Sequence, residues 1–323
     1  MSAAPLSIPS LGLGERVQDT FLVWDVERRT QADGSPWAIL HLANSTGRVP
    51  TAPFWATELP QIQGLAKGAI VSVVGEVQDY RGGRQLKVTA IRSVPQALAD
   101  LARLLPSVGD VERYWRPLDK WRGELADGPW KRAVNACYED PDFRRAYERC
   151  PASTNHHHAQ LGGLLKHTVE VAYIAQAIAR TCGADWDLLF AGVLLHDIGK
   201  LEAYRFDGIF ETTDRGALLG HVALGALMLE ERLAALAPPL SRPERDVLLH
   251  LVLAHHGLLE YGSPVRPMTL EAEILHHADT ASARAASMAD ALRDPSNFEA
   301  GSAVSQTLWQ LDRRRAYRGS ADT

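Results

Sequence analysis

Histidine and aspartate residues gather in one part of this chain. Eleven of the twelve histidines lie between residues 156 and 277. Imidazole and carboxylate groups together bind divalent transition metals such as Mn, Fe, Co and Zn, and many buried imidazoles without a metal would be costly. The pattern therefore predicts a metal centre. Its candidate ligands, each beside an apolar run, are His167, His196, Asp197, His221, His255, His256 and Asp279.

Asp197 follows His196 directly and is the candidate that could join two ions, because a carboxylate can bridge metals whereas an imidazole nitrogen binds one. Two ions about 3.5–4 Å apart can clamp a phosphoryl group and lower the pKa of a bridging water. The resulting hydroxide would attack phosphorus in line, while the metals stabilise charge on the equatorial oxygens. This chemistry is phosphoester hydrolysis, with Asp197 as a catalytic residue.

Two further residues are candidates for contact with the phosphate or the leaving group, His158 and Lys200. Lys200 lies about one helical turn after Asp197, where a cation could meet a phosphate. The alternative is a lysine at a helix C-terminus, stabilised by the helix dipole. Isolated histidines such as His41, His250 and His276 are more often structural residues than ligands.

The candidate ligands require helices that aim them at a common point. From Pro95 onward the apolar residues have helical spacing, and helices that bury one face can direct ligands inward, as in helical-bundle metal sites. No strand pattern recurs after this point, so we expect an all-α domain. The predicted helices cover residues 96–105, pieces of 115–147, 164–181, 186–197, 217–236, 243–256 and 269–291.

Residues 15–93 show strand patterns instead. Dense apolar or β-branched runs at 21–24, 37–42, 69–77 and 85–91 are separated by turns that contain glycine. About 80 residues and five strands suit an OB-type barrel. We therefore predict two domains: an all-β barrel over 1–93 and an all-α helical bundle over 94–323, in which 94–150 form lead-in helices.

The composition limits the other functions. The net charge of −5 argues against a histone-like coating of nucleic acid, although residues 1–95 carry nine basic and eight acidic residues and are less acidic than the rest. Three scattered cysteines favour a reduced, cytoplasmic setting over a disulfide framework. We expect neither a signal peptide nor a membrane span, because no run of about 18 apolar residues occurs.

The ordered ligands, with the segment LLHDIGK at 194–200, resemble the HD-domain phosphohydrolase superfamily. The resemblance implies that His167, His196, Asp197 and Asp279 hold one ion. It implies that Asp197, His221, His255 and His256 hold a second. With the barrel in front, nearly the whole chain is similar to the YhaM-type 3′–5′ exoribonucleases, which implies Mn²⁺ as the metal, with Fe, Co, Zn, Ni or Mg as alternatives. Lys166 departs from the pattern, where such enzymes often carry Glu.

The same resemblance gives the barrel a role, because OB barrels bind single strands by aromatic stacking and a basic groove. The implied function is a metal-dependent 3′–5′ exoribonuclease that acts on single-stranded RNA, or also DNA, and releases nucleoside monophosphates. The alternatives are hydrolysis of a small nucleotide or cyclic dinucleotide, and an inactive nucleic-acid-binding adaptor. The sequence does not reveal the oligomeric state. The candidate nucleic-acid contacts are Trp24, Trp37, Trp55, Tyr80, Arg81, Arg84 and Lys87.

Overall fold

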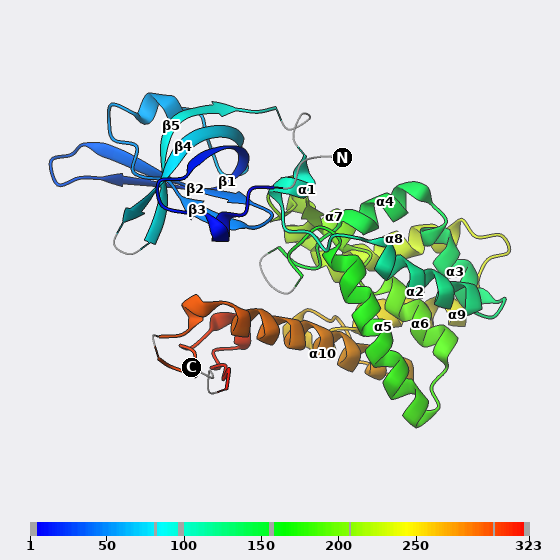
Figure 1. Ribbon diagram of the computed structural model, residues 1–323. Coiled ribbons are helices and arrows are strands. Elements are labelled where there is room, and N and C mark those ends of the chain that lie inside the picture. The colour runs from blue at the N-terminus through cyan, green and yellow to red at the C-terminus, as the bar shows by residue number, and fades with distance from the viewer. Residues whose placement is uncertain are drawn as a thin grey trace. The chain divides into compact units, whose positions relative to one another are not determined.

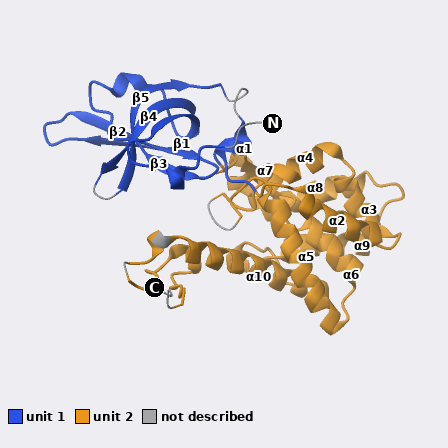
Figure 2. Cartoon of the chain, in the orientation of Figure 1, with its two compact units in different colours: residues 1–107, 207–209 blue, residues 108–206, 210–323 orange. Residues whose placement is uncertain are grey.

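The computed structural model describes residues 5–80, 83–95, 100–154, 158–206, 208–299 and 301–319. The chain forms two compact units (Figure 1, Figure 2), which consist of Met1–Ser107 with Asp207–Ile209 and of Val108–Phe206 with Phe210–Thr323. Within the described ranges, no helix has the length and apolar character needed to cross a membrane. All three cysteines lie in these ranges and are free thiols.

The first unit is built on a five-stranded antiparallel sheet with the order β3-β2-β1-β4-β5. Its strands are β1 (Arg16–Thr30), β2 (Pro36–Asn44), β3 (Gly47–Pro50), β4 (Ile70–Tyr80) and β5 (Gly83–Ser93). A parallel bridge from Thr51 to Leu86, and a hydrogen bond of 2.9 Å from the Ala52 amide to the Leu86 carbonyl, connect the two edges of the sheet. This closed topology is that of an OB-type barrel, as predicted.

Alternation along the strands fills the barrel. In β2, Leu40 and Leu42 are fully buried, whereas Ile39 and His41, which alternate with them, are partly exposed. The register of β1 against β2 is irregular between Val23 and Asp25, as in a β-bulge. Trp24 is the extra residue at this position, and its side chain is partly exposed, whereas that of Val23 is buried in the barrel.

The first unit extends to Ser107, beyond the boundary that we expected near residue 94. The short helix α1 (Leu101–Leu104) lies in this extension, and residues 96–99 of the expected helix lie outside the described ranges. The Ser45 amide donates to the Arg103 carbonyl at 2.8 Å, and the Arg103 guanidinium lies 3.1 Å from the Asp19 carboxylate. The change of periodicity at Pro95 marks the end of the strands but not of the barrel contacts.

The second unit is helical, as predicted. Pro129 and Pro141 each begin a helix, a position where proline costs no hydrogen bond, and this explains the breaks expected within 115–147. The main helices are α2 (Glu112–Glu124), α3 (Pro129–Tyr138), α4 (Pro141–Arg149), α5 (Gly163–Cys182), α6 (Trp186–Leu195), α7 (Lys200–Ala203), α8 (Asp214–Ala234), α9 (Arg242–Ala254) and α10 (Leu270–Arg293).

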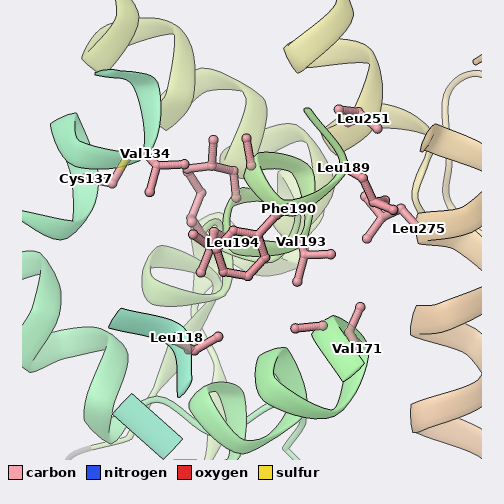
Figure 3. Close-up of a cluster of buried hydrophobic side chains, with 14 of the residues drawn as sticks. Leu118, Val134, Cys137, Val171, Leu189, Phe190, Val193, Leu194, Leu251 and Leu275 are labelled. Carbon is pink, nitrogen blue, oxygen red and sulfur yellow. The ribbon is translucent and has the colours of Figure 1, made fainter. Parts of the chain in front are cut away.

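Helix α6 is at the centre of this unit. All residues from Leu188 to Leu195 are buried, and a helix that is apolar on every side belongs in a core. Figure 3 shows Phe190 and Val193 of α6 among side chains contributed by neighbouring helices, including Leu118, Val134, Val171, Leu251 and Leu275. The core therefore fixes the end of α6, which is where the candidate ligands begin.

Three features of the second unit were not predicted. Two-residue strands, β6 (Tyr204–Arg205) and β7 (Glu211–Thr212), pair antiparallel, so the expectation of no further strand was wrong. Helix α8 is broken at Gly220, whose φ of 73° and ψ of 153° are not helical. After α10, a short segment around the turn η6 (Trp309–Leu311) packs on that helix through Leu308 and Leu311.

Candidate metal centre

Five elements of the helical unit bring the candidate ligands together. Helices α6 and α9 end at Leu195 and Ala254, so the pairs His196-Asp197 and His255-His256 directly follow a helix terminus. His167 lies on α5, and Asp279 lies on α10. His221 directly follows the break in α8 at Gly220. All seven predicted ligands are described, and six of them fall in two groups whose ligand atoms lie within 4.8 Å of one another, His167-His196-Asp197 and His221-His255-His256.

Asp197 is the centre of the arrangement, and its carboxylate oxygens face different partners. Oδ2 lies 3.2 Å from His196 Nε2 and 3.7 Å from His167 Nε2. Oδ1 lies 3.4 Å from His221 Nε2 and 3.7 Å from His255 Nε2. The side chain is 1% exposed. One carboxylate therefore connects the two groups of histidines.

The outer ring nitrogens of the histidines are anchored. Nδ1 of His196 donates to the Val193 carbonyl at 2.8 Å, Nδ1 of His255 to the Val252 carbonyl at 2.6 Å, and Nδ1 of His256 to the Tyr261 carbonyl at 2.6 Å. A carbonyl oxygen only accepts, so each of these rings carries a proton on Nδ1, and its neutral form has no proton on Nε2. Nε2 is then free to act as a ligand, and its direction is fixed.

The polar atoms at the centre fit a divalent cation. Among the described residues, eight buried side-chain atoms make no hydrogen bond, and four of them lie at this centre: Nε2 of His196, His221 and His255, and Oδ1 of Asp197. Leaving such groups unpaired is costly. Ligand atoms that bond one ion at about 2.1 Å and at right angles lie about 3 Å apart. The separations of Nε2 from the nearer Asp197 oxygen, 3.2 Å for His196 and 3.4 Å for His221, are close to this value.

The charges at the centre also suit a cation. Burial lowers the pKa of His255 well below its usual value and that of His221 to about 3, so both rings are neutral and able to coordinate. Burial by itself would raise the pKa of Asp197, but the charges of Lys200 and His196 outweigh it and hold that pKa far below normal. The centre therefore offers neutral imidazoles at His221 and His255 and an ionised carboxylate at Asp197.

A chain of hydrogen bonds stands behind His167. Ser282 Oγ donates to Glu170 Oε2 at 2.9 Å, because an ionised carboxylate only accepts. Ser282 Oγ must then accept from His167 Nδ1, which is 3.1 Å away. Glu170 Oε2 also lies 2.8 Å from His158 Nε2. Glu170 and Ser282 thus orient His167, as carboxylates behind metal-binding histidines do.

Ser282→Ala is expected to weaken binding of the metal by about 10–100-fold, the usual cost of losing such an outer partner. The His167 ring would lose the acceptor that fixes its orientation. Titration of the metal-free protein with Mn²⁺ by calorimetry measures the effect. Ser287→Ala on the same helix is the matched control and should bind Mn²⁺ as the unmodified protein does. Equal affinity of the two variants would show that Ser282 does not act on the centre.

His158 was predicted as a substrate contact, and the structure places it elsewhere. It is 6% exposed, and it lines a cavity between α5 and α10 together with Glu170 and Ser282. Lys166, the departure from the family pattern, lies in the same cavity, 3.8 Å from Glu170. Both residues therefore approach the centre from behind His167.

A pocket of about 280 Å³ opens onto the other side of the centre. Lys200 reaches it, with Nζ 2.5 Å from Asp197 Oδ2. Lys200 is the first residue of the single-turn helix α7, which begins five residues after the end of α6. Sequence reasoning missed Thr280, Ala283 and Arg284, although they follow Asp279 on the same helix. The lining residues are Lys200, His256, Tyr261, Asp279, Thr280, Ala283 and Arg284.

The predicted nucleic-acid contacts of the barrel do not all share one surface. Trp37 and Trp55 lie together, with ring centroids 5.8 Å apart. Arg84 donates to the Pro9 carbonyl and Lys87 pairs with Glu58, so these two cations are engaged within the barrel. Tyr80 is 57% exposed at the end of β4. Arg81 lies outside the described residues.

Trp24 lies beside basic side chains on the barrel. The Arg48 guanidinium stacks over its ring at 3.5 Å from the centroid. Together with Asp25, His41 and Lys67 these residues line a hollow of about 360 Å³ on the outer face of β1, β2 and β3. Arg29 of β1 pairs with Trp37 of β2, and its guanidinium lies over the Trp37 ring. A second pair of an arginine and a tryptophan therefore lies further along the same two strands.

Comparison with known proteins agrees with this geometry. The family model described as the HD domain matches residues 164–284, which contain every candidate ligand, and a model described as a putative helicase matches 132–185. Among solved structures, a domain of replication protein A from Methanococcus maripaludis aligns with 28% of this chain and 94% of its own length, at 20% identity and a TM-score of 0.24. The strand topology, and not that alignment, defines the barrel.

Curated relatives align with almost the entire chain. It is 30% identical over 315 residues to the 3′-5′ exoribonuclease YhaM of Halalkalibacterium halodurans, covering 95% of this chain and 94% of the relative. It is 32% identical over 311 residues to the 3′-5′ exoribonuclease YhaM of Bacillus subtilis, covering 95% and 96%. The chain belongs to the YhaM family of HD-domain exoribonucleases.

Proposed function

We propose that this protein is a metal-dependent 3′–5′ exoribonuclease that hydrolyses the terminal phosphodiester of single-stranded RNA and releases nucleoside monophosphates. The observation that carries the proposal is the position of Asp197, whose two oxygens face separate groups of histidines beside an open pocket. Nearly full-length similarity to 3′-5′ exoribonucleases supports the choice of a polymer substrate.

The candidate ligands would hold two divalent ions in this proposal. His167, His196 and Asp279 would complete one site with Asp197, and His221, His255 and His256 would complete the other. Imidazole and carboxylate suit Mn²⁺, our proposed metal, as well as Fe, Co or Zn. When bound, the ions supply Lewis acidity toward the phosphodiester and lower the pKa of a water.

The side chains of the pocket orient the substrate. Arg284 and Lys200 supply positive charge on the pocket wall for the non-bridging phosphate oxygens. Tyr261 is 54% exposed, and its ring is available to stack on the terminal base. Its carbonyl meanwhile holds His256, so the loop that forms the pocket rim also positions a candidate ligand.

The proposed activity is tested with the purified full-length chain, Mn²⁺, and three substrates: 5′-labelled single-stranded RNA, matched DNA and a cyclic dinucleotide. We expect a ladder that shortens from the 3′ end of the RNA, and release of nucleoside monophosphates. Chelation of the metal should stop the reaction. Hydrolysis of the cyclic dinucleotide alone would instead establish a small-nucleotide phosphodiesterase. Metal binding without any hydrolysis would favour the adaptor.

Trp24→Ala is expected to weaken binding of single-stranded RNA by about tenfold, because one stacked base is worth about 1–3 kcal/mol. The barrel would lose the ring on which Arg48 lies. Fluorescence anisotropy with a labelled RNA measures the affinity. Tyr80→Ala removes an exposed aromatic ring from another part of the barrel and serves as the control. If Tyr80→Ala weakened binding more than Trp24→Ala, the strand would follow β4 and β5 instead.

A further inference from the structure

The segment after α10 forms an ordered turn on that helix. Leu308 pairs with Arg314 and Val304 with Tyr317, as in a small hairpin, and the Asp312 amide donates to the Trp309 carbonyl at 3.1 Å. Leu308 and Leu311 are buried beneath this turn, against Met288 and Leu292 of α10. The turn therefore has a small core that fixes its position on the helix.

The outer side of this turn is aromatic and basic. Trp309 is 71% exposed and Tyr317 is 66% exposed, which is unusual for such large rings. The run Arg313-Arg314-Arg315 is exposed between them. A protein with a net charge of −5 thus concentrates three cations and two rings within nine residues.

The turn lies beside the catalytic pocket. Asp312 Oδ2 is 3.7 Å from the guanidinium of Arg284, and Arg284 lines the pocket that Asp279 and Lys200 also reach. Asp312 and Arg313 both adopt positive φ, at 54° and 59°, a conformation that costs free energy for residues other than glycine. This backbone directs Asp312 toward α10, so Arg284 connects the pocket with the basic turn.

We propose that residues 309–317 form a binding surface for single-stranded RNA at the rim of the catalytic pocket. The inference rests on the proposed exoribonuclease function. With the 3′-terminal nucleotide in the pocket, the upstream nucleotides pass Arg284 and reach the turn. Exposed rings accept bases of any sequence by stacking, and arginines bind the phosphates, which is the combination found in sequence-tolerant single-strand binding. The surface holds the strand as its end is consumed.

The test compares substrates of two lengths. The double variant Arg313→Gln/Arg315→Gln and the variant Trp309→Ala are assayed in full-length protein with Mn²⁺ on a 12-nucleotide RNA and on a trinucleotide. We expect kcat/KM on the 12-nucleotide RNA to fall about tenfold, mainly through a higher KM, and to fall much less on the trinucleotide. Arg145→Gln/Arg242→Gln removes the same charge from exposed positions on α4 and α9 and should leave both rates unchanged.

Binding measured in an Asp197→Asn background separates this inference from the proposed activity. The logarithm of the affinity for the 12-nucleotide RNA should depend less steeply on the logarithm of salt concentration, by about 0.7 for each arginine removed. If the variants lose no more RNA affinity than the Arg145/Arg242 control, the proposed RNA-binding surface is wrong, even if the unmodified enzyme degrades RNA. Equal losses on both substrate lengths would also overturn it. An unmodified protein that binds RNA but hydrolyses none would refute the activity alone.

Discussion

Asp197→Asn is expected to lower kcat for RNA by roughly 10⁴-fold, the size of loss that follows removal of a central member of a catalytic unit. The variant keeps the shape of the side chain but loses the charge that connects both groups of histidines. Single-turnover degradation of a 5′-labelled RNA measures the loss, and calorimetry with Mn²⁺ measures the accompanying loss of metal binding. Retention of more than a tenth of the activity would show that Asp197 does not join two ions.

The stability of this variant needs its own control. Asn at position 197 would leave the buried Lys200 cation without its partner, at a cost of about 3–5 kcal/mol in the metal-free protein. The double variant Asp197→Asn/Lys200→Met removes both charges, so it should recover much of that stability but none of the activity. Asp119→Asn is the control: it removes the partner of Arg144 in an ion pair that includes none of the candidate ligands, and it should leave kcat unchanged.

Gly199→Ala is expected to destabilise the helical unit by at least about 3 kcal/mol and to remove most of the activity. A Cβ at this position would lie 2.0 Å from the His221 carbonyl oxygen and 2.3 Å from the Gly225 amide nitrogen. Both are backbone atoms of α8, so the helix that carries His221 would have to move. This loss corresponds to a melting temperature that is lower by roughly 6–12 °C. Thermal unfolding monitored by circular dichroism measures it.

Gly123→Ala provides the matched control for this substitution. Gly123 lies in α2, and an added Cβ would meet no atom within 4 Å. Because alanine is the better helix former, this variant should be more stable by up to about 1 kcal/mol. If Gly199→Ala unfolded at the same temperature as the unmodified protein and stayed active, the close approach of α7 and α8 would not be essential.

Local sequence patterns were sufficient for the secondary structure of most elements. The apolar spacing of 164–181 and 269–291 predicted α5 and α10 to within a few residues, because burial of one face imposes a period that the sequence shows directly. The prediction differed from the structure where tertiary contacts, and not the apolar period, determine the structure of a segment. Residues 94–107 join the barrel, and β6 and β7 are too short to produce a pattern.

The candidate ligands could be found from the sequence, because metal-binding residue types are rare enough that their clustering is visible. Their supporting residues could not. Ser282 and Glu170 are ordinary helix residues until the packing of α10 on α5 brings them to His167. His158 illustrates the converse, since its residue type suggested a substrate contact whereas its position is behind a ligand. Trp24 shares a hollow with Arg48 and Lys67 only because the barrel places three separate segments side by side.

The sequence by itself thus determined the two-part architecture, the class of chemistry and the identity of the candidate ligands, since these depend on residue type and on short-range periodicity. The tertiary structure alone decided which oxygen of Asp197 faces which histidines, why Gly199 has no room for a side chain, and that Arg284 connects the pocket with the turn at 309–317. Those relations join residues that are distant in the chain, and only the packing of helices around α6 sets the distances between them.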